Sequence, residues 1–319
     1  MTAPVGLIVA VASSGFAATV GKAAVAAPPA PSWDALLTDW SLDLAFPVVI
    51  VVAAAYVVGL RRLDARGRAW PAARTVAFLS GLAVILIATE SGLAAYDRVL
   101  FSLHVVQHVL LAMVAALLLV LGAPVTLALQ ASSRPTQQKI LRVLHSAPVR
   151  VLTHPLTVWV LFGGTLFVLY FTPLYELSLR NDWVHAAVHA HFIVVGSLFL
   201  AHVVGIDPIP GALGYGARLL YVAVLLPFHT FIGVALLTTS TVIAAGWYDQ
   251  VERSWGASPL SDQRTGAGLL WVSGELFGAL AIGLVVRQWM AAEDRAAARH
   301  DRRLEGVDGP GTIDARGDR

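Results

Sequence analysis

The chain has 319 residues, of which 57% are hydrophobic and only 13% are charged, and its mean hydropathy is +0.72. A soluble surface needs roughly a quarter of its residues charged, so this composition excludes a soluble protein and predicts an all-α, polytopic membrane protein. The net charge of only +2 argues against nucleic-acid binding. Cysteine is absent, which excludes disulfides, thiolate metal sites and thiol chemistry.

The first 31 residues have two interpretations. A small-residue apolar stretch at residues 5–20 is followed by a proline-rich stretch at residues 28–31. Ala24-Val25-Ala26 fits the small-x-small pattern of a signal-peptide cleavage site, but no Lys or Arg precedes the apolar part. Residues 1–31 are therefore either a signal peptide or an extra apolar segment with a proline-rich linker.

Residues 32–290 form the predicted transmembrane domain. A run of about 17 to 25 apolar residues crosses a hydrocarbon core of roughly 30 Å as a helix. We expect a bundle of about seven such helices, at residues 42–60, 73–93, 99–121, 156–174, 183–204, 219–242 and 266–287. Residues 291–319 are charged and poor in large apolar side chains, which predicts a mostly disordered cytoplasmic tail after a short helical extension.

The basic residues orient these seven spans. Lys and Arg near the ends of spans stay on the cytoplasmic side of a membrane. Seventeen of the 22 Lys and Arg residues lie between spans one and two, three and four, or five and six, or after span seven. This asymmetry predicts that the N-terminus lies outside and the C-terminus lies in the cytoplasm.

Two pairs of histidines are the most informative feature of the sequence. His104 and His108 begin span three, and His185 and His189 begin span five. A spacing of four places both rings of a pair on one helical face. Both spans run inward, so the pairs share one depth in the outer leaflet, where costly polar groups usually face a bundle interior. We predict that the four imidazoles form a metal site near the outer face, with Asp262 either a further ligand or a helix cap.

The donor types narrow the choice of metal. Imidazole with carboxylate suits copper(II), zinc or haem iron, whereas copper(I) favours thiolate and thioether ligands. Met113 and Met290 are poorly placed for an outer site, while Glu90 and Asp97, near the outer end of span two, either add oxygen ligands or meet water. The expected ion is copper, with zinc as an alternative. A membrane cytochrome with bis-histidine haem b is a third interpretation.

A second pair of ionisable residues lies deeper in the membrane. Glu275 is some nine residues into span seven, and His229 follows Pro227 near the middle of span six. Midplane groups of this kind serve transporters, so a copper or proton transporter that uses Glu275 and His229 is the alternative function. The structural interpretation is a neutral carboxyl bonded to a facing helix and a satisfied histidine at a proline kink.

Four segments of the chain together form a recognisable pattern. In chain order they are FSLHVVQHVLLAMVAALLLVLGAPVTLALQ at 101–130, HAAVH at 185–189, GIDPIP at 205–210 and SPLSDQ at 258–263. This combination resembles the CtaG-like, caa-type cytochrome c oxidase assembly proteins. The resemblance extends over about residues 42–289. It implies a multi-pass protein of the bacterial plasma membrane that is not an enzyme and that helps to form a respiratory haem-copper oxidase through copper delivery. The implied partners are oxidase subunits, membrane lipid and other copper chaperones.

The motif residues of the family can be assigned to positions in this chain. The family's two histidine pairs fall on His104 with His108 and on His185 with His189, and its Asp-Gln element falls on Asp262 and Gln263. Where members of the family carry methionines, this chain has Val105, Val109 and Leu270. These departures weaken a thioether-assisted copper(I) site and leave the imidazole cluster intact.

Overall fold

The computed structural model describes residues 25–32, 34–35 and 39–307 of the chain. Most of the predicted signal peptide or apolar segment, residues 1–24, therefore lies outside the described residues, as do residues 308–319 at the end of the predicted tail. In the described part, the strands are one short parallel pair, β1 (Val25–Ala26) with β2 (Val251–Glu252).

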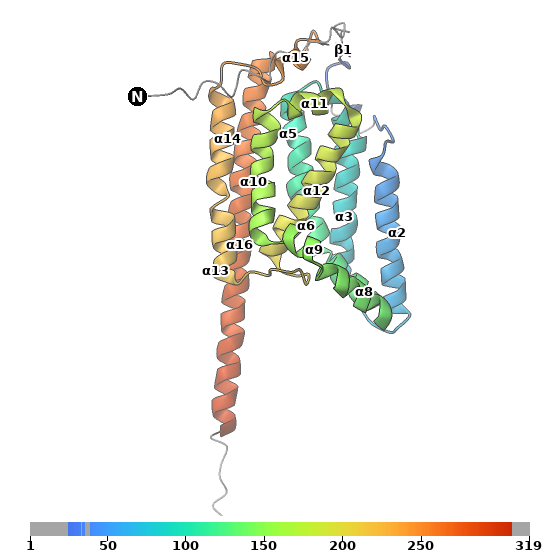
Figure 1. The fold of residues 1–319 in the computed structure, drawn as a ribbon, viewed down its shortest axis with the longest axis vertical. Helices are drawn as coiled ribbons and strands as arrows, with labels where there is room; N and C mark the ends of the chain where they lie inside the picture. Colours follow the sequence, from blue (N-terminus) through green and yellow to red (C-terminus); the bar gives the residue numbers. More distant parts are fainter. Residues whose placement is uncertain (1–24, 33, 36–38, 308–319) are drawn as a thin grey trace, which may run out of the picture.

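Helices make up nearly all of the remaining structure (Figure 1). The first half of the bundle contains α2 (Ala45–Asp64), α3 (Ala72–Glu90), α4 (Gly92–Tyr96), α5 (Phe101–Val109), the π-helical turn η2 (Leu110–Ala115), α6 (Ala116–Leu121) and α7 (Pro124–Ala131). The second half contains α8 (Arg134–Leu144), α9 (Ala147–Leu152), α10 (Pro155–Phe171), α11 (Leu174–Arg180), α12 (Asp182–Val204), α13 (Tyr215–Ala223), α14 (Leu226–Thr238), α15 (Ala245–Tyr248) and α16 (Pro259–Val307).

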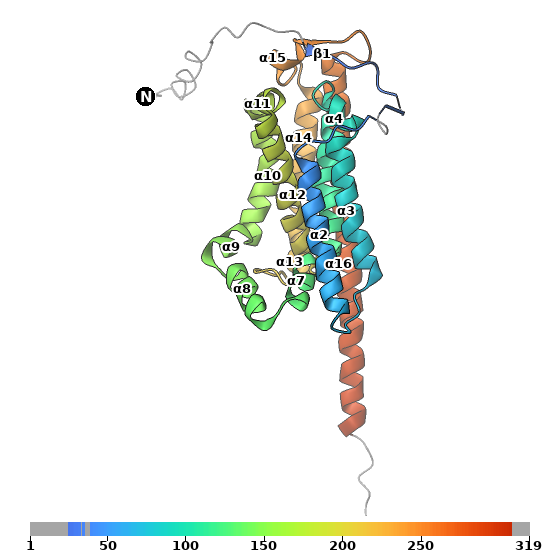
Figure 2. The ribbon, with the colours of Figure 1, turned by 90° about the vertical axis from the view of Figure 1, so that its right-hand side faces the viewer.

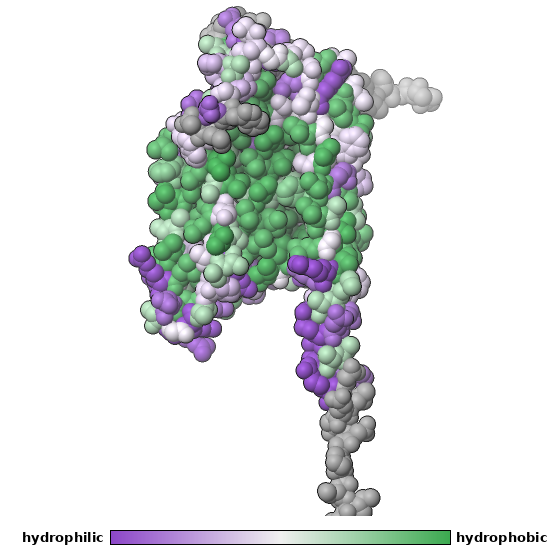
Figure 3. Space-filling model, turned by 180° about the vertical axis from the view of Figure 1, so that it is seen from behind, coloured by the Kyte–Doolittle hydropathy of each residue, from purple (hydrophilic) through white to green (hydrophobic). Residues whose placement is uncertain are grey.

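The helices confirm the predicted membrane bundle. Six helical stretches are long and apolar enough to cross a membrane: Ala45–Asp64, Ala72–Tyr96, Phe101–Ala131, Asp182–Val204, Tyr215–Thr238 and Pro259–His300. A seventh arises when α10 and α11, bent by 76°, count as one span. Exposed apolar side chains form a broad band on the face drawn in Figure 3, as expected for a surface in contact with lipid.

Three spans depart from regular α-helix, through a bend, a break and a π-helical turn, and these irregularities affect where their side chains lie. The bend between α10 and α11 falls at Thr172 and Pro173, because proline disfavours helical backbone in the residue before it. The expected span 156–174 therefore ends early and turns into α11. Span six breaks between α13 and α14, with Pro227 in the first turn of α14. Span three contains η2, and π-helical turns widen a helix locally and alter the direction of its side chains.

The two ends of the bundle differ. The α2–α3 turn, α8, α9 and the start of α13 lie at one end, and α11, α15 and the strand pair lie at the other (Figures 1 and 2). We call the first the arginine end, because the basic connecting segments gather there, and the second the histidine end. The connections thus alternate between ends as the predicted topology requires.

The last helix is longer than expected. Helix α16 continues without a break to Val307, 49 residues in all, and projects beyond the bundle at the arginine end (Figure 1). The helical extension expected after residue 290 is thus longer than predicted, since it reaches Val307, and the remainder of the predicted tail lies outside the described residues. The run of residues from Ala291 to Ala298 contains many good helix formers, which explains the continuation.

Two buried or half-buried carboxylates cap helices that lie far away in the sequence. Glu90 accepts hydrogen bonds from the backbone N–H groups of Asp43 (2.5 Å) and Phe46 (3.1 Å) at the start of α2. Asp207 accepts them from Val125 (3.0 Å) and Thr126 (2.8 Å) at the start of α7. First-turn N–H groups lack partners within their helix and favour a nearby negative charge. Glu90 is thus a helix cap in this structure.

Candidate metal centre

The two histidine pairs face each other across the interface between α5 and α12. Ring centroids are 4.0 Å apart in the pair His104 and His108, and 4.2 Å apart in the pair His185 and His189. Across the interface, His104 lies 5.7 Å from His185, and His108 lies 5.7 Å from His189. All four side chains are buried. The structure therefore brings the four rings into one cluster at the histidine end, which we call the histidine cluster.

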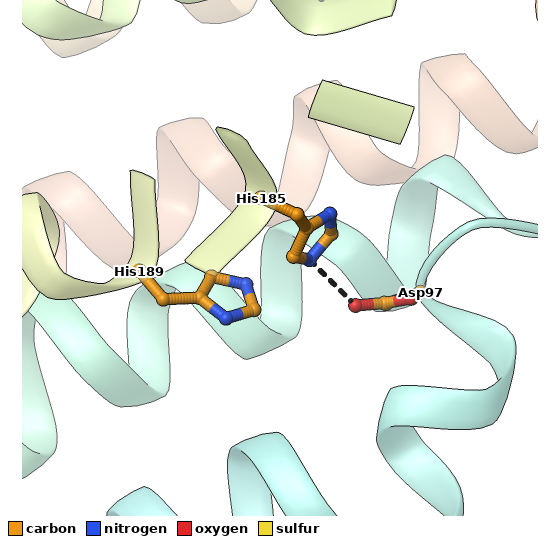
Figure 4. Close-up of side chains that lie close together, drawn as sticks. All are labelled: Asp97, His185 and His189. Carbon is orange, nitrogen blue, oxygen red and sulfur yellow. Dashed lines mark ion pairs between the residues drawn. The ribbon is translucent and has the colours of Figure 1, made fainter. Parts of the chain in front are cut away.

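Asp97 adds a carboxylate to this cluster. Its Oδ2 lies 3.0 Å from Nε2 of His185, and one donor atom each from Asp97, His185 and His189 lie within 4.8 Å of one another (Figure 4). Asp97 is the C-cap of the short helix α4, which begins after the chain turns at Ser91 in extended conformation. This turn directs the carboxylate back toward α12. Three donors at such distances are able to bind one metal ion after small side-chain adjustments.

Several donor atoms of the cluster have no hydrogen-bond partner. Among the described residues, the buried side-chain atoms without one include Oδ1 of Asp97, both ring nitrogens of His104, Nε2 of His108 and Nδ1 of His185. Outside the cluster, the corresponding set in the described chain contains Nε2 of His202. Leaving a buried polar atom unpartnered costs about 1–3 kcal/mol. Nitrogen and carboxylate donors gathered in this way fit a metal such as copper(II) or zinc.

Gln107 fixes the orientation of one ring in the cluster. Its Nε2 donates a hydrogen bond to the carbonyl oxygen of Ala88 at 2.8 Å, so its Oε1 faces His189 and accepts from Nε2 at 2.9 Å. His189 then carries its proton on Nε2 and leaves Nδ1 available to a metal. Gln107 follows His104 by three residues on the same face of α5. Gln107 was not among the predicted site residues, although a polar side chain between two histidines of an apolar span was a usable signal.

Aromatic side chains cover the cluster at the histidine end. The ring of Tyr175 lies 4.9 Å from that of His104, and its hydroxyl is 2.6 Å from that of Tyr248. Burial raises the pKa of the Tyr248 phenol, so this hydroxyl stays protonated and neutral. Trp247 donates from Nε1 to the carbonyl oxygen of Arg98 at 2.7 Å, which ties the α15 segment to the start of span three. This cover shields the imidazoles from bulk water.

Asp262 lies outside the three-residue donor group. Its Oδ1 accepts from the hydroxyl of Ser102 at 2.5 Å, and its Oδ2 accepts from the N–H of Ser102 at 3.3 Å. The neighbouring Gln263 accepts from the N–H of Ile243 at 2.7 Å. The Asp-Gln element therefore joins α16 to the start of α5 and to the segment before α15. It supports the helix that carries His104 and His108.

The deeper pair of ionisable residues is not joined by a hydrogen bond among the described residues. Oε1 of Glu275 accepts from the hydroxyl of Thr230 at 2.5 Å. The ring of His229 packs on Gly274, where an added Cβ would lie 2.6 Å from it, and lines a small apolar cavity of about 40 Å³ with Met113. Glu275 bonds a facing helix, as in the structural interpretation of this pair.

Most of this chain matches one family of known proteins. The family model described as "Cytochrome c oxidase caa3 assembly factor (Caa3_CtaG)" matches residues 54–292, about three quarters of the chain. The chain belongs to this family. The matched region of this Caa3_CtaG member includes both histidine pairs, Asp97 and Gln107.

Curated relatives come from mycobacteria. Uncharacterized proteins of Mycobacterium bovis and Mycobacterium tuberculosis are each 37% identical to this Caa3_CtaG member over 286 residues, and one of Mycobacterium leprae is 36% identical. Each alignment covers 87% of the chain and 43% of the relative. The chain thus spans less than half the length of these relatives. No solved structure matches it significantly.

Proposed function

We propose that this protein helps to assemble a respiratory haem-copper oxidase by binding copper at the histidine cluster and passing it to an oxidase subunit. The description of its family supports the role in oxidase assembly. The observation that carries the copper proposal is the set of buried, unpartnered imidazole nitrogens beside a carboxylate. A set of this kind is costly in the absence of a ligand.

Each residue of the cluster has a part in the proposal. Asp97, His185 and His189 are the nearest group of donors and bind the ion first. His104 and His108 have free ring nitrogens next to this group and complete the coordination. The carboxylate of Asp97 offsets part of the charge of the ion in an otherwise apolar interior. Imidazole and carboxylate donors favour copper(II) or zinc over copper(I).

The position of the cluster suits delivery on the outer side of the membrane. The distribution of basic residues predicts that the histidine end faces outward. A copper ion bound there lies on the same side of the membrane as an extracytoplasmic copper centre of an oxidase, which receives its copper on that side. The partners in this proposal are oxidase subunits and the copper chaperones that supply the ion, and the protein itself catalyses no reaction.

Metal analysis of the purified protein tests the copper proposal. Protein loaded with copper(II) and freed of excess should retain stoichiometric copper, and His185→Ala with His189→Ala should remove it. The control is His191→Ala on the same helix. His191 lies outside the cluster, and its Nε2 is hydrogen-bonded to the hydroxyl of Thr165 at 2.6 Å. Full copper retention in the double variant would overturn the site. Preferential zinc retention, or a Soret band from haem, would overturn the choice of copper.

A genetic experiment tests the assembly role separately. Deletion of the gene should lower oxidase activity, and added copper should restore part of it. A strain that expresses the His185→Ala, His189→Ala variant should behave like the deletion strain, whereas the His191→Ala strain should behave like wild type. Normal oxidase activity in the deletion strain would contradict the proposed function.

A further inference from the structure

A polar pocket at the arginine end plays no part in the proposed function. It has a volume of about 360 Å³ and lies between the end of α2 and the turn that joins α7 to α8. Its walls include the side chains of Arg62 and Arg66 and three residues with hydroxyl groups, Ser132, Ser133 and Thr136. Among the described residues, no acidic side chain lines it.

The two arginines of the pocket differ in what they already bind. Arg66 donates from Nη1 to the carbonyl oxygens of Gln130 (2.9 Å) and Ser132 (3.0 Å), which holds its guanidinium against the end of α7. Within the described part of the chain, Arg62 has neither a hydrogen-bond nor an ion-pair partner. A guanidinium presents a fork of N–H donors that matches phosphate oxygens. The pocket therefore offers one free and one anchored guanidinium to an anion.

The helices next to the pocket have the character of membrane-surface helices. Residues 132–154 contain four basic residues, which are Arg134, Lys139, Arg142 and Arg150, and no Asp or Glu. The same segment exposes four large apolar side chains, which are Leu141, Val143, Val151 and Leu152. Helix α8 slopes across the arginine end (Figure 1), and its Thr136 lines the pocket together with the end of α2. Basic, amphipathic helices in such a position lie among lipid headgroups.

We propose that this pocket binds the phosphate of an anionic phospholipid headgroup. Arg62 and Arg66 contact the phosphate, and the hydroxyls of Ser133 and Thr136 lie beside it. The exposed apolar residues of α8 and α9 contact the acyl chains of the surrounding leaflet. Headgroup phosphate is favoured over free phosphate because α2 and α7, which flank the pocket, both belong to membrane spans. Basic segments next to spans attract anionic lipid.

Lipid titration of the purified full chain in mild detergent tests this site. Native mass spectrometry should show binding of dioleoyl phosphatidylglycerol that is at least about fivefold tighter than that of dioleoyl phosphatidylcholine. Arg62→Gln should remove most of this preference. Arg62 holds no other group in place, so the variant should keep the melting temperature of the wild type.

A matched control separates the pocket from the general charge of this end. Arg287→Gln removes the same charge from α16 near the arginine end, outside the pocket, and should keep the lipid preference. Equal binding of the two lipids by the wild type, or an equal loss in both variants, would overturn the proposal. Inorganic phosphate is the third ligand tested in the same experiment. Binding of phosphate alone, without preference for phosphatidylglycerol, would identify a free-anion site and overturn the lipid assignment.

Discussion

The side chain of Gln107 determines which nitrogen of His189 faces the histidine cluster. Its amide is held in one orientation by the carbonyl oxygen of Ala88, so only its oxygen is directed at the imidazole. Gln107→Leu should therefore free the ring to rotate and lower copper(II) affinity by about 10- to 100-fold. Competition titration against a chelator measures this. Gln138→Leu, an exposed change on α8, is the control, and equal affinities in the two variants would contradict the positioning role.

Asp97 and Asp262 should respond differently to substitution. Asp97 lies among the imidazoles, so Asp97→Ala should lower copper occupancy. Asp262 bonds Ser102 through both oxygens, so Asp262→Ala should lower stability by about 0.5–2 kcal/mol, as loss of a helix cap does. Thermal unfolding and metal analysis of both variants check this. Loss of copper from a stably folded Asp262→Ala protein would restore Asp262 as a ligand.

Part of the cluster could be predicted from residue spacing. The pairs His104 with His108 and His185 with His189 repeat at one helical turn, and this periodicity indicated one face and one depth. The position of Asp97 in the cluster depends on the turn at Ser91, and no pattern in the sequence predicts this turn. Glu90 and Asp97 look alike in the sequence, and only their tertiary surroundings make one a helix cap and the other a member of the cluster.

At the scale of helices, the histidine cluster depends on close contact between α12 and η2. A Cβ added to Gly196 would overlap the carbonyl of Ala112. Gly196→Ala should therefore push the two helices apart, destabilise the fold by about 1–3 kcal/mol and weaken copper binding. Gly164→Ala on α10 is the control, because a Cβ there meets no atom within 4 Å. Equal melting temperatures for the two variants would show that this contact is adaptable.

The cap provided by Asp207 explains why the acidic residue of the GIDPIP segment lies beside α7. Asp207→Ala leaves two first-turn N–H groups and the hydroxyl of Thr126 without their acceptor. The expected loss of stability is about 1–2 kcal/mol, and Asp207→Asn should recover part of it through its remaining carbonyl oxygen. Thermal unfolding of both variants measures this. An unchanged melting temperature in Asp207→Ala would contradict the capping role.

The helices themselves were more predictable than their interruptions. Apolar runs long enough to cross a bilayer indicated seven spans, because length and hydropathy alone decide that property. The π-helical turn η2 consists of ordinary helix-forming residues, so nothing in its sequence separates it from α5. Helices α8 and α9, with 11 and 6 residues, are too short to cross a membrane, and they lie in the segment that was expected only to connect spans three and four.

At the scale of the whole molecule, the positions of the connecting segments predict one orientation in the membrane. A green fluorescent protein fused after residue 307 should fluoresce, because it folds in the cytoplasm. Alkaline phosphatase inserted near residue 254, at the histidine end, should be active outside. The opposite pattern for the two reporters would place the histidine cluster on the cytoplasmic side and remove the basis for outward copper delivery.

The length of α16 determines how far its C-terminal end lies from the membrane surface. At 1.5 Å per residue its 49 residues extend about 74 Å, of which a hydrocarbon core accounts for roughly 30 Å. The 20 residues that follow the predicted span carry the end of this helix roughly 30 Å beyond the hydrocarbon core, and thus about 20 Å clear of the headgroups. A molecule that binds those turns therefore contacts this protein away from the bilayer surface.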